Sequence, residues 1–377
     1  MRYLWRYVAV ASLLVALGWF TFSNILSAQQ ANRDRQIMVR EASLQSGMPL
    51  FKEEEQEEAA EDFRVWLFVM VPVNRTLVLP YFLHHYLSLG IKPELCHVIL
   101  HVQDEVKQAE DLRTMKHILQ TFSVPFVVYV GEYTNHNKAR LMKQYQKKRG
   151  VRPSDWMLPT DSDELQQWLP FINKHLSSSA LSSPSSNGTD NADENEQEAF
   201  TSVPKFLKMI AQQNYTHVKG VLVDRLSYDG SLKDPLPFPL PSSSSSAKQQ
   251  TTATTLEEQY PLCCNVSRKV SRGITSKIAA HRFQYPIAPT GAHRMLDHPH
   301  LKQWPSSVAN EGMRSKGEGG GIMPIHHFKF VPEMKSMLED RVAAYKSRGM
   351  NLWKISQRFL DHMNSHGGRL CKRRKVE

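Results

Sequence analysis

Short apolar runs alternate with amphipathic stretches through the middle of the chain. The strand-like runs, rich in Val, Ile, Leu and Phe, are residues 64–71, 95–102, 125–130 and 156–160. The helix-like stretches between them are residues 76–89, 108–122 and 135–149, with Gly90 and Gly150 at the ends of the first and the last. Four strands that alternate with three helices predict an α/β domain with a Rossmann-like, mostly parallel sheet flanked by helices.

The pattern of apolar runs continues with wider spacing after residue 160. We expect a helix after Glu164 that runs to about His175. The other predicted elements are strands at 217–223 and 274–280 and helices at 332–347 and 352–364. Ser/Thr-rich stretches without periodicity predict disordered insertions at 176–200 and about 241–256, and a third flexible segment at 306–321.

The amino-terminal region predicts a membrane anchor. Residues 7–26 are mostly apolar and uncharged, and about 20 such residues span a bilayer as a helix. A cleaved signal peptide is the alternative, but its apolar core is usually about 7–15 residues. The predicted order is therefore a cytosolic tail (1–6), a transmembrane signal anchor (7–26), a polar stem (27–62), a luminal domain (63–370) and a basic tail (371–377).

The orientation of this anchor is not decided by charge, because Arg2 and Arg6 precede it and Arg33, Arg35 and Arg40 follow it. A short tail before the span and a long domain after it favour a luminal domain. Four N-glycosylation sequons agree with that placement, and they begin at Asn74, Asn187, Asn214 and Asn265.

The net charge and the cysteines indicate which classes of partner and which kinds of site are compatible with the sequence. The net charge of +10 suits nucleotide phosphates, acidic glycans or phospholipid headgroups, and no pattern indicates a nucleic-acid partner. Cys96, Cys263, Cys264 and Cys371 allow three pairings, and the adjacent pair is expected to bond elsewhere rather than to itself. The absence of a C-x-x-C pair in the sequence argues against a zinc site.

An acidic segment, Asp161-Ser162-Asp163-Glu164, follows the fourth predicted strand directly. Mg²⁺ and Mn²⁺ prefer one or two carboxylates together with substrate phosphates. In open α/β sheets, ligands bind at the carboxyl ends of the strands, and this segment falls at such an end. The segment therefore predicts a metal bridging the protein and a diphosphate. The alternative is an acidic loop that caps the next helix.

Several strings, in order from about residue 64 to 330, resemble the eukaryotic glycosyltransferases of the family 2 and family 92 type. They are 79–90, Asp155-Trp156 leading into 161–164, 220–225 with Gly230, Gly291-Ala292-His293 and 327–330. The resemblance implies a glycosyltransferase-A fold and a type II membrane protein of the Golgi or endoplasmic reticulum. It also implies a nucleotide-diphosphate sugar donor, Mn²⁺ (or Mg²⁺), a glycan or glycoprotein acceptor, and inversion at the sugar.

The same resemblance assigns roles to individual residues. Asp161 and Asp163 match the metal motif, with Asp163 as the direct ligand, and His327 matches a histidine that completes the metal shell. The expected donor-binding residues are Asn74, Arg75, Asp104, Asp161, Arg225 and Lys329. The chain departs from the family where Arg75 replaces a common Glu and at 103–105, which leaves the nucleotide open.

An inverting transferase also needs a carboxylate that deprotonates the acceptor hydroxyl. Asp224 and Asp229 are the candidates, although Asp224 can pair with an arginine and Asp229 can build an Asp-Gly turn. Glu164 is expected to hold the acidic segment, and His293 is a further candidate. The alternatives are a catalytically silent relative that binds glycans or a partner, and a metal-dependent hydrolase or nucleotidyltransferase.

Overall fold

The computed structural model describes residues 63–173, 202–240, 254–270, 272, 274–288, 292–304 and 322–371. All of them belong to one compact unit, Ala59–Glu377. The expected anchor, cytosolic tail and stem lie outside the described residues, as do 176–200, 306–321, Asn187 and Gly291. No helix within the described ranges is long and apolar enough to cross a membrane.

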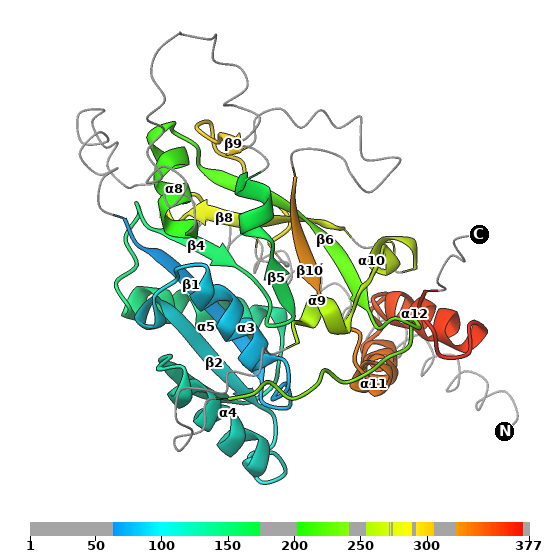
Figure 1. The fold of residues 1–377 in the computed structure, drawn as a ribbon. Coiled ribbons are helices and arrows are strands. Elements are labelled where there is room, and N and C mark those ends of the chain that lie inside the picture. The colour runs from blue at the N-terminus through cyan, green and yellow to red at the C-terminus, as the bar shows by residue number, and fades with distance from the viewer. Residues whose placement is uncertain are drawn as a thin grey trace, which may run out of the picture. The chain divides into compact units, whose positions relative to one another are not determined.

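The unit is built on a mixed sheet, shown in Figure 1. The strands are β1 (Val65–Pro72), β2 (Cys96–Val102), β3 (Phe126–Val130), β4 (Trp156–Pro159), β5 (Glu164–Gln166), β6 (His217–Leu226), β7 (Leu262–Cys264), β8 (Ser276–Arg282), β9 (Gln303–Trp304) and β10 (Met323–His327). Their order across the sheet is β3-β2-β1-β4-β8-β6-β10-β5, and β7 and β9 also pair with β6.

The direction of the strands decides where their ends meet. β1 is parallel to β2 and β4, and β3 is parallel to β2. β8 runs antiparallel between β4 and β6, so β6 and its parallel neighbour β10 again share the direction of β1. The carboxyl ends of β1, β2, β3, β4, β6 and β10 therefore lie at one edge of the sheet, here called the carboxyl edge.

Helices cover both faces of the sheet. They are α3 (Leu79–Ser88), α4 (Ala109–Thr121), α5 (Asn135–Lys148), α8 (Val203–Gln212), α9 (Leu256–Gln259), α10 (Val266–Lys269), α11 (Glu333–Ser347) and α12 (Trp353–Ser365), with a 3₁₀ turn at Pro93–Leu95. In β1, Leu67 and Val69 pack with α3, α4 and α8, whereas Trp66 and Phe68 pack with α5. Because successive side chains of a strand point to opposite faces, covering both faces explains the uninterrupted apolar run of β1.

The predicted mixed α/β class, with a mostly parallel sheet flanked by helices, is confirmed. The helix expected after Glu164 begins later than predicted, because Glu164–Gln166 forms β5 and the helix begins at residue 168. This strand is polar in sequence but buried, since Lys277 contacts Glu164 and the amide of Gln166 donates to the carbonyl of Ala279. Hydrogen-bond and ion-pair partners on β8 thus allow these polar residues to be buried in a strand, and the apolar pattern of the sequence does not predict that strand.

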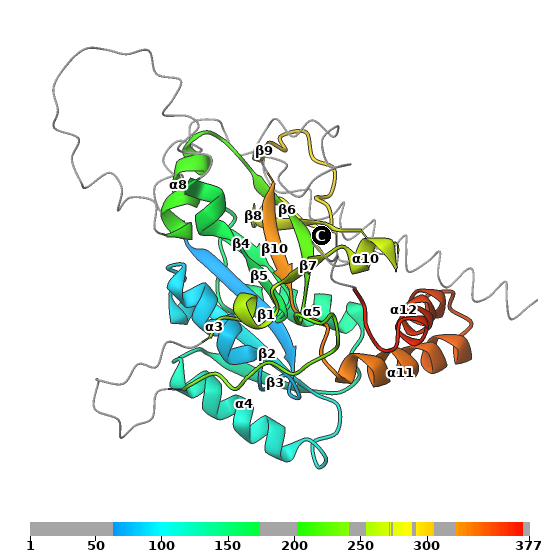
Figure 2. The same ribbon diagram turned by 45° about the vertical axis from the view of Figure 1, so that its right-hand side comes forward.

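α11 and α12 lie side by side in both views of the molecule (Figures 1 and 2) and pack on a second apolar cluster with Leu226 and Val266. Cys371 follows α12 and forms a disulfide with Cys264. The expected free tail from residue 371 is therefore corrected at its first residue, while 372–377 lie outside the described residues. The chain passes close to Gly230, which has a φ of +73°, and a Cβ added at this position would clash with the carbonyl oxygen of Cys371, so only glycine fits here.

The insertion expected at about 241–256 is also shorter than predicted. Thr255 caps α9 in a reciprocal arrangement: its hydroxyl accepts from the N–H of Glu258, and Glu258 accepts from the N–H of Thr255. Leu256 is buried in the main apolar cluster. The sequence Thr-Leu-Glu-Glu predicts this capping box, which places the beginning of the ordered segment at residue 255.

Candidate functional site

The register of β10 brings the acidic segment and two other segments to one place at the carboxyl edge. His327, the last residue of β10, is opposite Asp224 on β6 and Glu164 on β5. Asp163 directly precedes β5, and its carbonyl accepts a 2.7 Å hydrogen bond from the N–H of Phe328. The predicted residues Asp163, Asp224 and His327 are therefore neighbours, although they are far apart in sequence.

His327 is held between two carboxylates. Its Nδ1 lies 3.1 Å from Oδ1 of Asp224, and its Nε2 lies 3.9 Å from Oδ2 of Asp163. Asp224 is almost fully buried, whereas the Asp163 side chain is 19 % exposed. A carboxylate at Nδ1 favours the tautomer with the proton on Nδ1, which leaves the Nε2 lone pair directed towards Asp163.

Ser267 on α10 completes the surroundings of Asp224. Its backbone N–H donates to Oδ2 of Asp224 at 2.6 Å and its hydroxyl donates to Oδ1 at 2.8 Å. Burial favours the protonated form of Asp224, but the hydrogen bonds from His327 and Ser267 and the charge of Lys329 outweigh it and lower the pKa of Asp224. Asp224 is therefore a fixed negative charge behind His327.

Lys329 lies on the other side of Ser267. Its Nζ donates to the Ser267 hydroxyl at 3.0 Å and stands over the rings of Phe330 and Phe359 at 5.1 and 5.5 Å. Burial lowers the pKa of Lys329, and the nearby charges of Asp224 and Asp163 only partly offset that effect. The result is a partly desolvated ammonium group beside Asp224.

Asp161 and Glu164 face two lysines that the sequence did not single out. Lys138 from the first turns of α5 and Lys277 from the start of β8 both form ion pairs with Asp161. Lys277 also pairs with Glu164, and the side chains of these two are each only 3 % exposed. Burial raises the pKa of Asp161, but the charges of Lys277 and Lys138 outweigh burial and hold it below its ordinary value. These four residues form a compact, charge-balanced cluster.

The donor set can be compared with what Mn²⁺ or Mg²⁺ requires. Within the described part of the chain, no group of three or more His, Cys, Asp and Glu side chains is arranged to hold a metal. Asp163 and Nε2 of His327 nevertheless form a two-donor set whose histidine is oriented by a second carboxylate. Such a set fits an ion that takes its remaining ligands from water and substrate phosphates. Asp161 fits less well, because both of its oxygens contact lysines.

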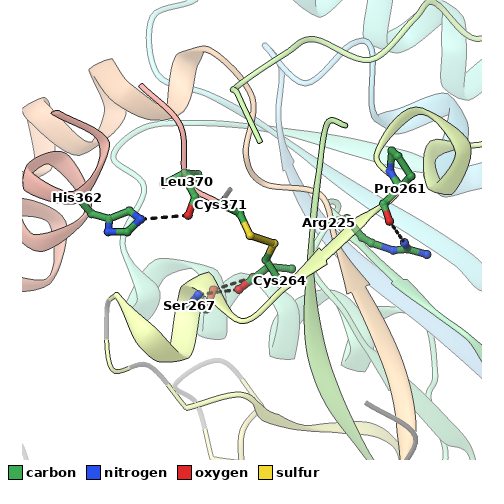
Figure 3. The surroundings of a disulfide bond; sticks show 8 residues. Arg225, Pro261, Cys264, Ser267, His362, Leu370 and Cys371 are labelled. Carbon is green, nitrogen blue, oxygen red and sulfur yellow. Dashed lines mark hydrogen bonds between the residues drawn. A yellow bond between two sulfur atoms is a disulfide. The ribbon is translucent and has the colours of Figure 1, made fainter. Parts of the chain in front are cut away.

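Other predicted residues lie apart from this set. Arg225 contacts the carbonyl of Pro261 (Figure 3), and it also contacts the thiol of Cys263 and Nδ1 of His326, so it lies on the face of the β6–β10 pair opposite to Asp224. Asp229 accepts from Ser227 and Ser231 within the turn that precedes Gly230, which matches the turn interpretation. Nδ1 of His293 lies 2.7 Å from the carbonyl of Ser276.

Asn74, Arg75 and Asp104 lie after β1 and β2, at the same edge of the sheet but in local turns. Arg75 donates its N–H to the carbonyl of Pro72, and Asp104 accepts from the N–H groups of Val106 and Lys107. No hydrogen bond or ion pair between described residues joins these three to the acidic segment. The sequon residues Asn74, Asn214 and Asn265 are exposed, as glycan attachment requires.

Three residues of the site were missed from sequence: Ser267, Lys138 and Lys277. Ser267 is the hydroxyl residue of the sequon that begins at Asn265, but that pattern indicates only a glycosylation site and not a contact with Asp224. The lysines had no signal in the sequence, because a lysine in a polar helix or at a strand end is ordinary. Their roles depend on which strands are neighbours, and only the insertion of β8 beside β4 places Lys277 against the acidic segment.

The hydrogen bonds of Ser267 predict a role in positioning His327. We expect Ser267→Ala to weaken Mn²⁺ binding about tenfold to hundredfold, because Asp224 loses one donor and holds His327 less firmly. Mn²⁺ titration followed by electron paramagnetic resonance measures the effect. Ser336→Ala, on the exposed side of α11, is the control. Equal Mn²⁺ affinity of Ser267→Ala and Ser336→Ala would show that Ser267 does not position His327.

No protein-family model and no curated protein matches this chain. Function must therefore be inferred from the side chains at the carboxyl edge. Their chemistry combines the partly exposed carboxylate of Asp163 with the oriented imidazole of His327 and the partly desolvated ammonium group of Lys329, and the carboxylate is more than a hundred residues from the other two in sequence. Such convergence of polar groups at the ligand-binding edge of an α/β sheet is typical of a functional site.

Proposed function

We propose that this chain is a metal-dependent glycosyltransferase that transfers a sugar from a nucleotide-diphosphate donor to a glycan or glycoprotein acceptor. The observation that carries the proposal is the Asp163–His327–Asp224 arrangement at the carboxyl edge. Asp163 and His327 provide two donors for a divalent cation, and Asp224 orients the imidazole of His327. Together with the family-like strings, this arrangement favours a glycosyltransferase-A type of enzyme over other metal-dependent reactions.

Each residue then has a distinct task. Asp163 and Nε2 of His327 would hold Mn²⁺ or Mg²⁺, and the ion would supply Lewis-acid stabilisation of the departing diphosphate. Lys329 adds positive charge beside the phosphates, and the partly buried position of its ammonium group strengthens that effect. Asp224 keeps the imidazole in place and in the required tautomer. Asp161 and Glu164, paired with lysines, hold the acidic segment in position.

The catalytic base of the proposed inverting reaction is not one of the two carboxylates expected from sequence. Asp224 has both oxygens engaged by Ser267 and His327 and is buried, so an acceptor hydroxyl has no access to it. Asp229 is occupied by the turn around Gly230. We therefore assign Asp224 a positioning role rather than that of the base.

The proposed location is the Golgi or endoplasmic reticulum membrane, with residues 7–26 as the anchor and the described unit in the lumen. The disulfide between Cys264 and Cys371 supports an oxidising compartment. Exposed sequon asparagines at 74, 214 and 265 agree with passage through the lumen. The same arrangement presents the carboxyl edge to luminal glycans.

The test uses the full chain in detergent and a panel of nucleotide sugars. Release of nucleoside diphosphate is measured with Mn²⁺ and with a chelator, each with and without a mixed glycan acceptor. We expect release from one donor, stimulated by acceptor and lost with the chelator. Release that ignores acceptor would indicate a hydrolase. Release that persists in the chelator, from a metal-free preparation, would refute a metal-dependent transferase.

One observation favours a second candidate, a catalytically silent relative that binds a glycan or a partner. Both oxygens of Asp161 contact lysines, so this carboxylate of the expected metal motif is already neutralised. Calorimetry with the donor panel separates the candidates. A transferase binds one donor more tightly with Mn²⁺ than without it, whereas a silent relative shows no metal-dependent donor binding in a folded preparation.

A further inference from the structure

α5 has a strong imbalance of charge. Between Glu132 and Asp155 the chain contains seven Lys and Arg residues and no Asp or Glu. Lys138 pairs with Asp161, and Arg152 pairs with Asp155. Arg140, Lys147 and Lys148 add positive charge along the helix and at its C-terminal end, where like charges repel one another and an anionic ligand is favoured.

The exposed residues of α5 form one basic face. Arg140, Lys143 and Lys147 are exposed at spacings of three and four residues, which places them on one side of a helix, and the exposed Lys148 borders that side. We call these four the α5 basic face. With a rise of about 1.5 Å per residue, it extends roughly 12 Å along the helix axis. Among described residues, Arg140, Lys147 and Lys148 have no carboxylate within ion-pair distance.

The opposite side of α5 is already used by the fold. Leu141, Met142 and Tyr145 pack against Trp66 and Phe68 of β1. A helix that lies in a membrane interface needs an apolar face free to enter the lipid. α5 has none left, so a bilayer or an apolar groove of another protein fits this face poorly. A flexible, polar and anionic ligand fits it well.

The helix also leads to the proposed site. Lys138, in the first turn of α5, pairs with Asp161 of the acidic segment, and Arg140 begins the basic face two residues later. We propose that the α5 basic face binds an acidic glycan, with carboxylate or sulfate groups, as the extended part of the acceptor. This inference rests on the proposed function for the role of the glycan, while the binding itself requires neither donor nor metal.

The experiment measures binding of a hexagalacturonate to the full chain in nonionic detergent by calorimetry, without nucleotide or metal. We expect binding that weakens with salt, and no binding of the neutral maltohexaose. The variant Arg140→Gln/Lys147→Gln/Lys148→Gln should lower the association constant about tenfold, at roughly twofold for each exposed charge. The control Lys205→Gln/Lys208→Gln/Lys335→Gln removes the same charge from α8 and α11 and should bind as the wild type does.

Equal loss in the two triple variants would overturn the inference, because binding would then follow net charge alone. Binding of anionic vesicles that depends on the α5 face, without binding of hexagalacturonate, would overturn it in favour of a membrane contact. Failure of the proposed function is recognised separately. A chain that binds hexagalacturonate through α5 but releases no nucleotide keeps this inference and loses the transferase. An active transferase that does not bind acidic glycans keeps the proposed function and loses this inference.

Discussion

Replacement of Asp163 by asparagine is expected to lower metal-dependent nucleotide release at least about hundredfold while the domain stays folded. Asparagine has nearly the same size but lacks the charge that a divalent cation needs from this position. The structural contact of Asp163 is made by its backbone carbonyl, which accepts from Phe328 and is unaffected by the substitution. The Asp163 side chain is partly exposed, so its loss leaves no buried group unpaired.

Release of nucleoside diphosphate at saturating Mn²⁺ measures the effect on activity, and Mn²⁺ titration measures the effect on the metal. Asp340→Asn on the exposed side of α11 is the matched control, since it removes the same charge far along the chain from the site. Thermal unfolding of both variants checks the fold. If Asp163→Asn bound Mn²⁺ and released nucleotide like Asp340→Asn, Asp163 would not be a metal ligand.

The strands and helices of the first hundred residues of the domain could be predicted because their patterns are local. β1 is an apolar run buried on both faces, and α4 has apolar residues at helical spacing on one side. α8 was not predicted, although Val203, Phe206, Leu207 and Ile210 show helical spacing between the two Ser-rich stretches. The short β7 and α10 depend on contacts with β6 and α12 and have too few residues for a periodic signal.

The candidate site could be predicted only in part, because only some of its residues are placed by local sequence patterns. The acidic segment follows a recognisable strand, so its place at the carboxyl edge could be inferred from the order of elements. The partners of each carboxylate could not, because β8 enters antiparallel between β4 and β6 and brings Lys277 to Asp161. Arg225 illustrates the opposite error. It is next to Asp224 in sequence, but adjacent strand residues face opposite sides of a sheet.

Lys277→Met is expected to destabilise the domain by about 3–5 kcal/mol, the largest effect on stability that the site offers. Lys277 and Glu164 are each 3 % exposed, so removal of the ammonium group leaves a buried carboxylate without its cation. The double variant Lys277→Met/Glu164→Gln should recover much of the loss, because it removes the unpaired charge as well. Lys219→Met on β6 is the control, since Lys219 is only half-buried, and should change stability by less than about 0.5 kcal/mol. Denaturant unfolding followed by tryptophan fluorescence measures all three.

The pH dependence of the free energy of unfolding of these variants tests whether Lys277 controls the charge of Asp161. In the wild type, Lys277 and Lys138 outweigh burial and hold the pKa of Asp161 below its ordinary value. A carboxylate with a lowered pKa stabilises the fold above its unfolded pKa, near 4, and this contribution is lost as the pH falls through the folded pKa. Without Lys277 the pKa of Asp161 moves up, so stability should rise less steeply between about pH 2 and pH 5. A slope in Lys277→Met as steep as in Lys219→Met would show that Lys138 alone sets the charge of Asp161, and that the buried lysine serves only Glu164.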